Sequence, residues 1–261
     1  MVDVSQFSIE GRKALITGGS RGIGAATALV FARAGADVAV SSRKLPDLEK
    51  VAAEVRKLGK KALAVEAHLG KLENIKPLVD RVMAEFGRID ILVNNAGMGF
   101  GVPALEMTEQ AWDSVLNLNL KGLFFLSQAV VRAMKDRGGC RIINIASVDA
   151  FRVQVPLGHY SIAKAGVVQA TKVMALEWAQ YGVLANCIAP GAVETRLFDS
   201  NFGALPPEQL KATKDSMAKR LPVGHLGQPQ ELANVILFLA SDASSYMTGE
   251  TILVDGGSLL R

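Results

Sequence analysis

The stretch "KALITGGSRGIGAATALVFA", residues 13–32, decides the fold of this chain. It starts with a short apolar run of strand character, continues through a glycine cluster, and ends in apolar residues at helical spacing. Glycines in such a turn let the backbone approach a pyrophosphate, and the following helix offers free N–H groups and a partial positive charge to the anion. The stretch therefore predicts a nucleotide cradle, with an ordinary turn as the alternative. The glycines of the cradle are Gly18, Gly22 and Gly24.

Short apolar runs alternate with longer helical patterns along the rest of the chain. This rhythm predicts an α/β fold: a single-domain, doubly wound, Rossmann-type sheet of seven mainly parallel strands with helices on both faces. The expected strands are residues 13–17, 37–42, 62–67, 90–97, 141–147, 184–191 and 251–257, and the expected helices are about 22–34, 46–58, 72–86, 109–134 and 158–181. One domain over 1–261 follows, because no linker or repeat interrupts the rhythm. The least regular segment, about 192–222, is predicted to be a substrate loop or lid.

Composition narrows the classes of protein. The 261 residues are 49% hydrophobic, and the net charge of +4 is dispersed, which gives no sign of a nucleic-acid partner. Cys140 and Cys187 lie in apolar runs and are predicted to be buried free thiols, as a reducing cytoplasm allows. The N-terminus lacks a signal-peptide pattern, and we expect no apolar run near the roughly 20 residues of a membrane span. The three histidines lie in separate segments, so no metal site is predicted.

The string "GHYSIAKAG", residues 158–166, places Tyr160 and Lys164 one helical turn apart on the same face. A free phenol has a pKa of about 10, and a neighbouring ammonium together with a positively charged ring favours the phenolate. The pair is then a general acid or base, unless it is only an aromatic and a charge on a half-buried helix. Ser147 ends the fifth strand, where its hydroxyl can bond a substrate oxygen. Asn119 is an amide in the middle of a long helix, which makes it a candidate residue of the site. The alternative is that it has a purely structural role.

The end of the second strand indicates which nicotinamide cofactor binds. Folds that prefer NAD place an acid there for the ribose 2′-hydroxyl, but this chain has Ser42 followed by Arg43. A guanidinium can bind a 2′-phosphate, and Arg21 in the glycine loop adds a second cation. We therefore predict NADP rather than NAD. The alternative is that Arg43 and Lys44 only solubilise the start of a helix.

Several strings in fixed order carry a family resemblance. The glycine spacing is Gly-x3-Gly-x-Gly, and "NNAG" (94–97), "NLNLKG" (117–122), "IINIAS" (142–147), "YSIAK" (160–164), "IAPG" (188–191) and "MTGETILVDGG" (247–257) follow it. Over nearly its whole length the chain resembles the short-chain dehydrogenase/reductase family. The resemblance implies NADP-dependent hydride transfer between a secondary alcohol and a ketone. Tyr160 would carry the proton, Ser147 would orient the oxygen, Lys164 would hold the nicotinamide ribose, and Asn119 would complete a water relay.

The resemblance also implies a set of cofactor-binding residues. Besides Tyr160 and Lys164 they are Gly18, Ser20, Arg21, Gly22, Ile23, Gly24, Ser42, Arg43, His68, Leu69, Asn95, Ala96, Gly97, Pro190, Gly191, Val193 and Thr195. His68 stands where the family usually has an aspartate that meets the adenine. It is expected either to stack or hydrogen-bond there, or to be a plain surface residue.

The substrate is the least determined part of the function. Several strings look most like family members acting on sugar acids or polyols, such as gluconate and deoxygluconate dehydrogenases. The expected pocket wall is Met98, Phe100, Asp149, Phe151, Gln154, Leu157, Arg196, Leu197, Phe198 and Phe202, with Arg152, Arg196 and Gln154 as polar anchors. One alternative is a 3-oxoacyl thioester reductase of fatty-acid type, although its basic docking positions match only at Arg137 and not at Tyr181. The other is a non-catalytic NADP-sensing protein.

Two long helices are apolar over more than one face, which suggests contact between copies of the chain. The residues expected to face outward are Val168, Thr171, Ala175 and Trp178, and the run "GLFFLSQAVV", 122–131, behaves likewise. A helix fully buried in a monomer is the alternative. The family resemblance implies a homotetramer.

Overall fold

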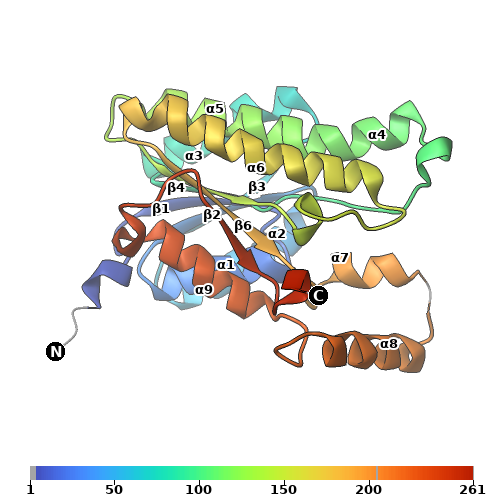
Figure 1. Ribbon diagram of the computed structural model, residues 1–261. Coiled ribbons are helices and arrows are strands. Elements are labelled where there is room, and N and C mark those ends of the chain that lie inside the picture. The colour runs from blue at the N-terminus through green and yellow to red at the C-terminus, as the bar shows by residue number, and fades with distance from the viewer. Residues whose placement is uncertain (1–3, 204, 261) are drawn as a thin grey trace.

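A single seven-stranded sheet forms the centre of the computed structural model, which describes residues 4–203 and 205–260 (Figure 1). The strands lie in the order β3-β2-β1-β4-β5-β6-β7, and every neighbouring pair is parallel. They are β1 (Lys13–Thr17), β2 (Asp37–Ser42), β3 (Ala62–Glu66), β4 (Ile91–Asn94), β5 (Arg141–Ile145), β6 (Leu184–Pro190) and β7 (Thr251–Val254). The predicted fold class is confirmed. The predicted runs 90–97 and 251–257 extended beyond their strands into the turns that follow.

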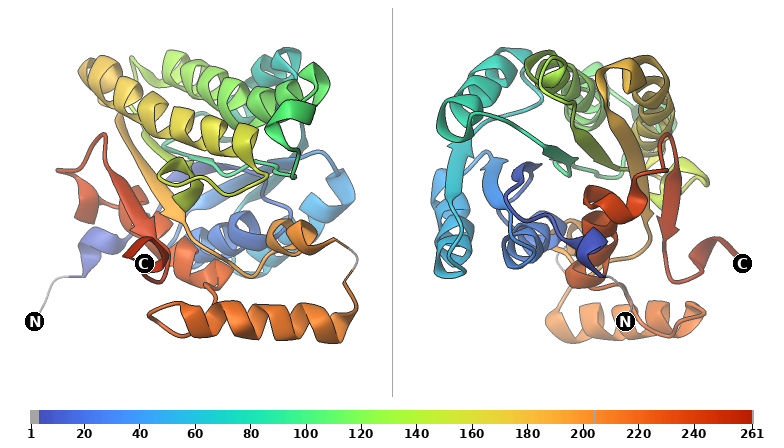
Figure 2. Two further views of the ribbon diagram at one scale, coloured as in Figure 1. Left: turned by 45° about the vertical axis from the view of Figure 1, so that its right-hand side comes forward. Right: turned by 90° about the vertical axis from the view of Figure 1, so that its left-hand side faces the viewer.

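Helices cover both faces of the sheet because successive strand residues point to opposite sides. In β1, Leu15 packs in one buried cluster, while Ala14 and Ile16 pack in the other. One layer contains α3 (Ile75–Phe86), α4 (Glu109–Leu116), α5 (Leu123–Met134) and α6 (Gly158–Trp178), and the other contains α1 (Gly22–Arg33), α2 (Leu45–Lys57) and α9 (Pro229–Ala240). The right panel of Figure 2 shows the sheet between these two layers.

The strand order reverses between β1 and β4. The chain proceeds from β1 outward to β2 and β3, then returns to place β4 on the other side of β1. Loops at the carboxyl ends of these two strands diverge, and a crevice opens where doubly wound sheets bind their ligands. The functional residues expected from the sequence follow the carboxyl ends of six of the strands.

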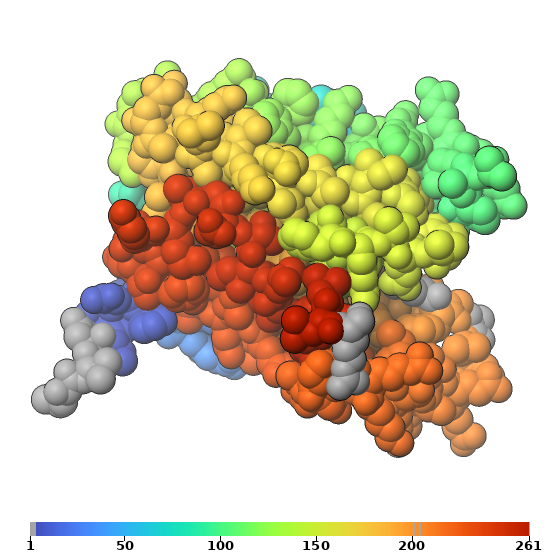
Figure 3. Space-filling view, viewed as in Figure 1, coloured from blue at the N-terminus to red at the C-terminus, as the bar shows by residue number. Residues whose placement is uncertain are grey.

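The segment 192–222 is more regular than the sequence suggested. It contains α7 (Arg196–Asp199) and the fourteen-residue helix α8 (Pro207–Arg220). No residue of α8 is fully buried, and its half-buried side has only Leu210, Met217 and Ala218 as apolar residues, which is a weak pattern for sequence reasoning to find. In the space-filling view the orange residues of this segment form the lower right edge of the molecule (Figure 3).

The helical run Glu109–Met134 corrects another expectation. By length and composition alone it could cross a membrane, although we expected no apolar run of that size. In the structure it is interrupted by a π-helical turn, Asn117–Gly122, and its continuation α5 packs against α3 and the sheet. The core of the fold therefore covers those of its apolar side chains that face α3, α6 and the sheet.

The outer faces of the long helices also differ from the prediction. Val168, Thr171 and Ala175 are buried, and Trp178 packs against the core. The apolar side chains that do reach the surface of α4, α5 and α6 are Trp112, Phe125, Ile162, Val173 and Leu176. Cys140 and Cys187 are buried free thiols, as predicted.

Candidate active site

The glycine loop after β1 has the close packing that its sequence implies. Gly18 and Gly22 have φ values of +62° and +54°, which favour glycine. A Cβ on Gly24 would collide with the carbonyl oxygen of Gly18 and lie 2.5 Å from Nδ2 of Asn95. Asn95 in turn donates from Nδ2 to the carbonyl oxygens of Thr17 and Gly18, at 2.9 and 3.1 Å. The loop is thus fixed to the end of β4, and it has no room for a side chain at Gly18 or Gly24.

One pocket runs from this loop across the ends of β2, β3 and β4. The helix α1 opens onto it without a side-chain cap or an acidic residue in its first turn, so its amino end is available to an anion. Among the described residues, no ion pair engages Arg21, Arg43 or Arg196, which all line the pocket. The buried hydroxyl of Ser42 lacks a hydrogen-bond partner. An elongated, polyanionic nucleotide matches these features.

Most of the expected cofactor residues lie in this pocket. Its walls include Gly18, Ser20, Arg21, Gly22, Ile23, Ser42, Arg43, Leu69, Asn95, Ala96, Gly97 and Thr195. His68 does not line the pocket, and its Nδ1 accepts from the N–H of Gly70 at 3.2 Å, so a contact of His68 with the adenine stays a prediction. Met98 and Arg196, expected on the substrate side, line this pocket instead. Sequence reasoning missed Ser41, Ala67 and Leu118.

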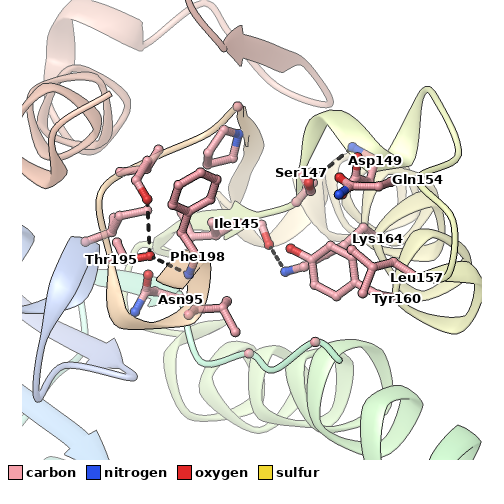
Figure 4. A pocket seen from close by; sticks show the side chains of 18 residues that line it. Asn95, Ile145, Ser147, Asp149, Gln154, Leu157, Tyr160, Lys164, Thr195 and Phe198 are labelled. Atoms are coloured by element: carbon pink, nitrogen blue, oxygen red, sulfur yellow. Dashed lines mark hydrogen bonds between the residues drawn. The ribbon is translucent and has the colours of Figure 1, made fainter. Parts of the chain in front are cut away.

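A second pocket adjoins the first and contains the expected reacting groups (Figure 4). Ser147, Tyr160 and Lys164 all line it, together with Pro190, Gly191 and Val193. The Nζ atom of Lys164 lies 5.6 Å from the centre of the Tyr160 ring. It donates to the carbonyl oxygen of Ile145 at 2.6 Å, so the ammonium is held at the end of β5. One turn of α6 therefore aims both side chains into the space that Ser147 borders.

Burial dominates the protonation of the pair. It raises the pKa of Tyr160 to about 12, with the Asp149 carboxylate adding to the rise and a hydrogen bond to Ser147 opposing it. Burial likewise lowers the pKa of Lys164 to about 8. From the sequence we expected the ammonium, together with the positive ring of an oxidised nicotinamide, to lower the pKa of the phenol. In the protein alone the pKa of Tyr160 is raised instead, because desolvation by burial outweighs the hydrogen bond to Ser147.

Asn119 is fully buried in the π-helical turn between α4 and α5. Its Oδ1 accepts from the N–H of Met98 at 2.9 Å, and its Nδ2 donates to the carbonyl oxygen of the same residue at 2.7 Å. The side chain therefore fixes the loop after β4. Its part in a proton relay stays a prediction.

The substrate side of the second pocket mixes polar and apolar residues. Of the expected wall, Asp149, Gln154, Leu157, Leu197 and Phe198 line it. Phe100, Phe151 and Phe202 do not. Phe100 packs against His159 and Phe202 against Phe198, at ring separations of 5.0 and 5.1 Å, and Phe151 is half exposed. Arg152 pairs with Asp149 at 3.4 Å and faces a separate hollow beside α8.

Sequence reasoning missed a buried hydrogen-bond network behind the site. Asn94 donates from Nδ2 to Ser127 and to Asn144, at 2.8 and 2.9 Å, and Asn144 donates to Thr171 at 2.9 Å. The network links β4 and β5 to α5 and α6, the helix that presents Tyr160 and Lys164. Polar residues in otherwise apolar strands and helices were its only signal in the sequence. It also missed Gly99, whose Cβ would lie 2.9 Å from the Tyr160 ring.

Comparison with known proteins gives concordant matches. The family model described as enoyl-(acyl carrier protein) reductase matches residues 18–258. The 2-dehydro-3-deoxy-D-gluconate 5-dehydrogenase of Escherichia coli strain K12 is 42% identical, covering 99% of both chains. The 3-oxoacyl-(acyl-carrier-protein) reductase of Thermotoga maritima is 40% identical, covering 97% of this chain and 99% of that one. The solved gluconate 5-dehydrogenase of Burkholderia cenocepacia J2315, in complex with NADP and tartrate, has a TM-score of 0.90 and is 36% identical, covering 98% of both chains.

Proposed function

The chain belongs to the short-chain dehydrogenase/reductase family of oxidoreductases, and we propose that it interconverts a secondary alcohol and a ketone with NADP(H). The convergence of Ser147, Tyr160 and Lys164 in a pocket that adjoins the nucleotide pocket carries this proposal. A phenol, a hydroxyl and an ammonium at one point are the groups that protonate and polarise a carbonyl oxygen.

In the proposed reaction the chain moves a proton and holds an oxygen. When bound, the nicotinamide dinucleotide donates or accepts the hydride and, when oxidised, brings a positive charge beside the phenol. Tyr160 gives its proton to the ketone oxygen during reduction and takes it back during oxidation. Ser147 donates a hydrogen bond to that oxygen. Lys164, held by the carbonyl of Ile145, is placed to bind the ribose of the cofactor and to favour the phenolate.

The pKa of Tyr160 suits ketone reduction. A value of about 12 keeps the phenol protonated at neutral pH, which is the state that a general acid needs. Alcohol oxidation needs the phenolate, and its rate should therefore rise with pH over the range in which reduction declines.

The preference for NADP is supported by the polar groups at the end of β2. Within residues 4–203 and 205–260, the Ser42 hydroxyl has no hydrogen-bond partner and no ion pair engages Arg43 or Arg21 of the neighbouring glycine loop, so these groups offer a donor and two cations for a 2′-phosphate. The relative that was solved with NADP bound adds support. Measuring kcat/KM with NADPH and with NADH tests the preference, and a higher value with NADH would contradict it.

A sugar acid is the proposed substrate. Asp149 and Gln154 can accept hydrogen bonds from the hydroxyls of a polyol chain, and the ion pair of Asp149 with Arg152 brings a cation close to the pocket. The deoxygluconate-dehydrogenase relative and the tartrate in the solved relative support the same class. The decisive test is a screen of keto sugar acids, 3-oxoacyl thioesters and simple ketones, followed by the loss of NADPH absorbance.

The second candidate is a 3-oxoacyl thioester reductase. Leu157, Leu197 and Phe198 give the pocket an apolar side, and the Thermotoga maritima relative is almost as similar as the first. If acyl thioesters are reduced in the screen with the highest kcat/KM, this candidate replaces the sugar acid. Failure of every carbonyl compound while NADPH still binds would favour the non-catalytic sensor.

We also propose that the protein assembles into a homotetramer through α4, α5 and α6. The exposed Ile162, Val173 and Leu176 lie along one helix, with Phe125 on its neighbour, and large apolar side chains of this kind are usually covered in an assembly. Sedimentation equilibrium tests the assembly, and a monomer at all concentrations would refute it.

A further inference from the structure

The short helix α7 forms part of the wall of both pockets. Thr195, which caps it, and Leu197 line the nucleotide pocket and the substrate pocket alike. Arg196 lines only the nucleotide pocket, while Phe198 lines only the substrate pocket. Successive side chains of one turn thus face two different ligands, and Figure 4 shows Thr195 and Phe198 across the cavity from Tyr160 and Lys164.

Arg196 lies close to the glycine loop. The methyl group of the adjacent Thr195 would be 3.2 Å from a Cβ on Gly22, the first residue of α1. This contact places the start of α7 opposite the amino end of α1, where the backbone N–H groups are free. In a dinucleotide the pyrophosphate is the group that such an end binds.

The guanidinium of Arg196 is chemically available to an anion. The side chain is exposed, and no hydrogen bond or ion pair of its own is found in the described part of the chain. The carboxylate of its own helix, Asp199, is engaged elsewhere, because it pairs with Lys214 of α8 at 2.6 Å. The cation of α7 therefore faces the nucleotide pocket, whereas its anion holds the helix to α8.

Internal contacts join the residues of α7 to one another. Thr195 accepts the N–H of Phe198 through Oγ1 at 3.2 Å, and the Phe198 ring packs edge-on against Phe202. A ligand that fixes Arg196 consequently fixes the positions of Leu197 and Phe198 on the substrate side.

We propose that Arg196 binds the pyrophosphate of the cofactor from the side opposite the glycine loop, and that this contact positions Leu197 and Phe198 for the substrate. The inference rests on the proposed function only in that a nicotinamide dinucleotide binds. The pyrophosphate is common to NADP and NAD, so the contribution of Arg196 is the same for both cofactors. Arg43, at the end of β2, acts on the 2′-phosphate and therefore on NADP alone.

The experiment compares Arg196→Gln with Arg43→Gln, using Arg132→Gln on the outside of α5 as a control for loss of one positive charge. Kd values for NADPH and NADH are measured by titration calorimetry. Arg196→Gln should weaken both cofactors by a similar factor of about ten or more, since a charge-assisted hydrogen bond is lost. Arg43→Gln should weaken NADPH alone, and Arg132→Gln neither. Arg196→Lys should recover part of the loss.

A second measurement tests the positioning of α7. At saturating NADPH, Arg196→Gln should raise KM for the ketone several-fold, with a smaller change in kcat. Unchanged Kd values for both cofactors would overturn the proposal, and weakening of NADPH alone would assign Arg196 to the 2′-phosphate instead. A wild-type protein that prefers NADH would refute the proposed cofactor preference, yet it would leave the test of Arg196 intact. A wild-type protein that binds neither dinucleotide would refute the proposed function as well.

Discussion

The nucleotide end and the substrate end of the crevice are built differently. At the nucleotide end the glycine loop brings backbone to the surface, and Gly18 and Gly24 leave no space for a side chain at those two positions. At the substrate end, Gln154 and Leu197 reach in from exposed segments. A backbone surface restricts the sequence to a few residue types, whereas exposed side chains can change without loss of the fold. The first end can therefore be recognised from sequence, and the second defines what is specific to this protein.

The largest effect on turnover is expected at Tyr160, close to where the nucleotide and substrate ends of the crevice meet. Tyr160→Phe removes the proton donor but keeps the buried ring, so kcat should fall by about 10³-fold or more while NADPH binding stays nearly unchanged. Initial rates and a fluorescence titration with NADPH measure the two quantities. Tyr246→Phe, at a fully exposed position, is the matched control and should behave as wild type. Substantial turnover by the Tyr160 variant would remove this residue from the proposed chemistry.

The next largest effect concerns cofactor binding at the glycine loop. A Cβ at residue 24 collides with the Gly18 carbonyl and the Asn95 amide, so Gly24→Ala should weaken NADPH binding by about 100-fold or more. Gly158→Ala serves as the control, because nothing lies within 4 Å of its Cβ position. Circular dichroism establishes that the variant is folded before the titration. If Gly24→Ala binds NADPH as tightly as wild type does, the proposed close approach of the loop backbone to the pyrophosphate is wrong.

The same contrast explains what could be predicted from the sequence. The strand–glycine–helix unit fixed the fold class because continuous apolar strands and glycine turns leave few alternatives. Tyr160 and Lys164 could be paired because helical spacing alone puts them on one face. His68, Phe100 and Phe151 do not line the two pockets, and the sequence could not show this because the direction of a loop side chain depends on local hydrogen bonds and ring contacts that have no periodic signature. Helix α8 was missed because it buries no residue completely and has few apolar side chains on its half-buried side.

The free energy of unfolding should depend strongly on residues of the buried sheet and weakly on the exposed side chains of the substrate end. Leu15 in β1 is completely buried, and Leu15→Ala should lower the free energy of unfolding by about 2–5 kcal/mol. Leu197 on α7 is 40% exposed, and Leu197→Ala should lower it by less than about 0.5 kcal/mol while raising KM for the ketone a few-fold. Urea denaturation compares the two variants directly. Equal losses of stability would mean that the substrate end is as tightly integrated into the core as the sheet.

The last prediction concerns the loss of folding stability that results from burying the Lys164 ammonium in the active site. Burial lowers the pKa of Lys164 from 10.5 to about 8, so the folded state disfavours the ammonium. Below pH 8 both the folded and unfolded chains carry the charge and the cost is complete; it declines as pH rises towards 10.5, where the unfolded lysine loses its proton as well. Lys164→Met removes this cost but also the hydrogen bond to Ile145. At pH 7 the variant should be more stable than wild type by about 1–2 kcal/mol.

The pH dependence of that difference separates the charge from packing. Between pH 8 and 10.5 the stability advantage of Lys164→Met should shrink, because wild type gains stability as the folded lysine becomes neutral. Burial raises the pKa of Tyr160 to about 12, which lowers stability at high pH in both proteins alike. Burial raises the pKa of Cys187 to about 11 and the Lys164 charge opposes this rise, so the two proteins are compared most cleanly between pH 8 and about 9, below the ordinary pKa of the thiol. Urea denaturation at several pH values measures it. An advantage that is constant with pH would show that the methionine acts by packing, and that the ammonium is held at the active site without cost to the fold.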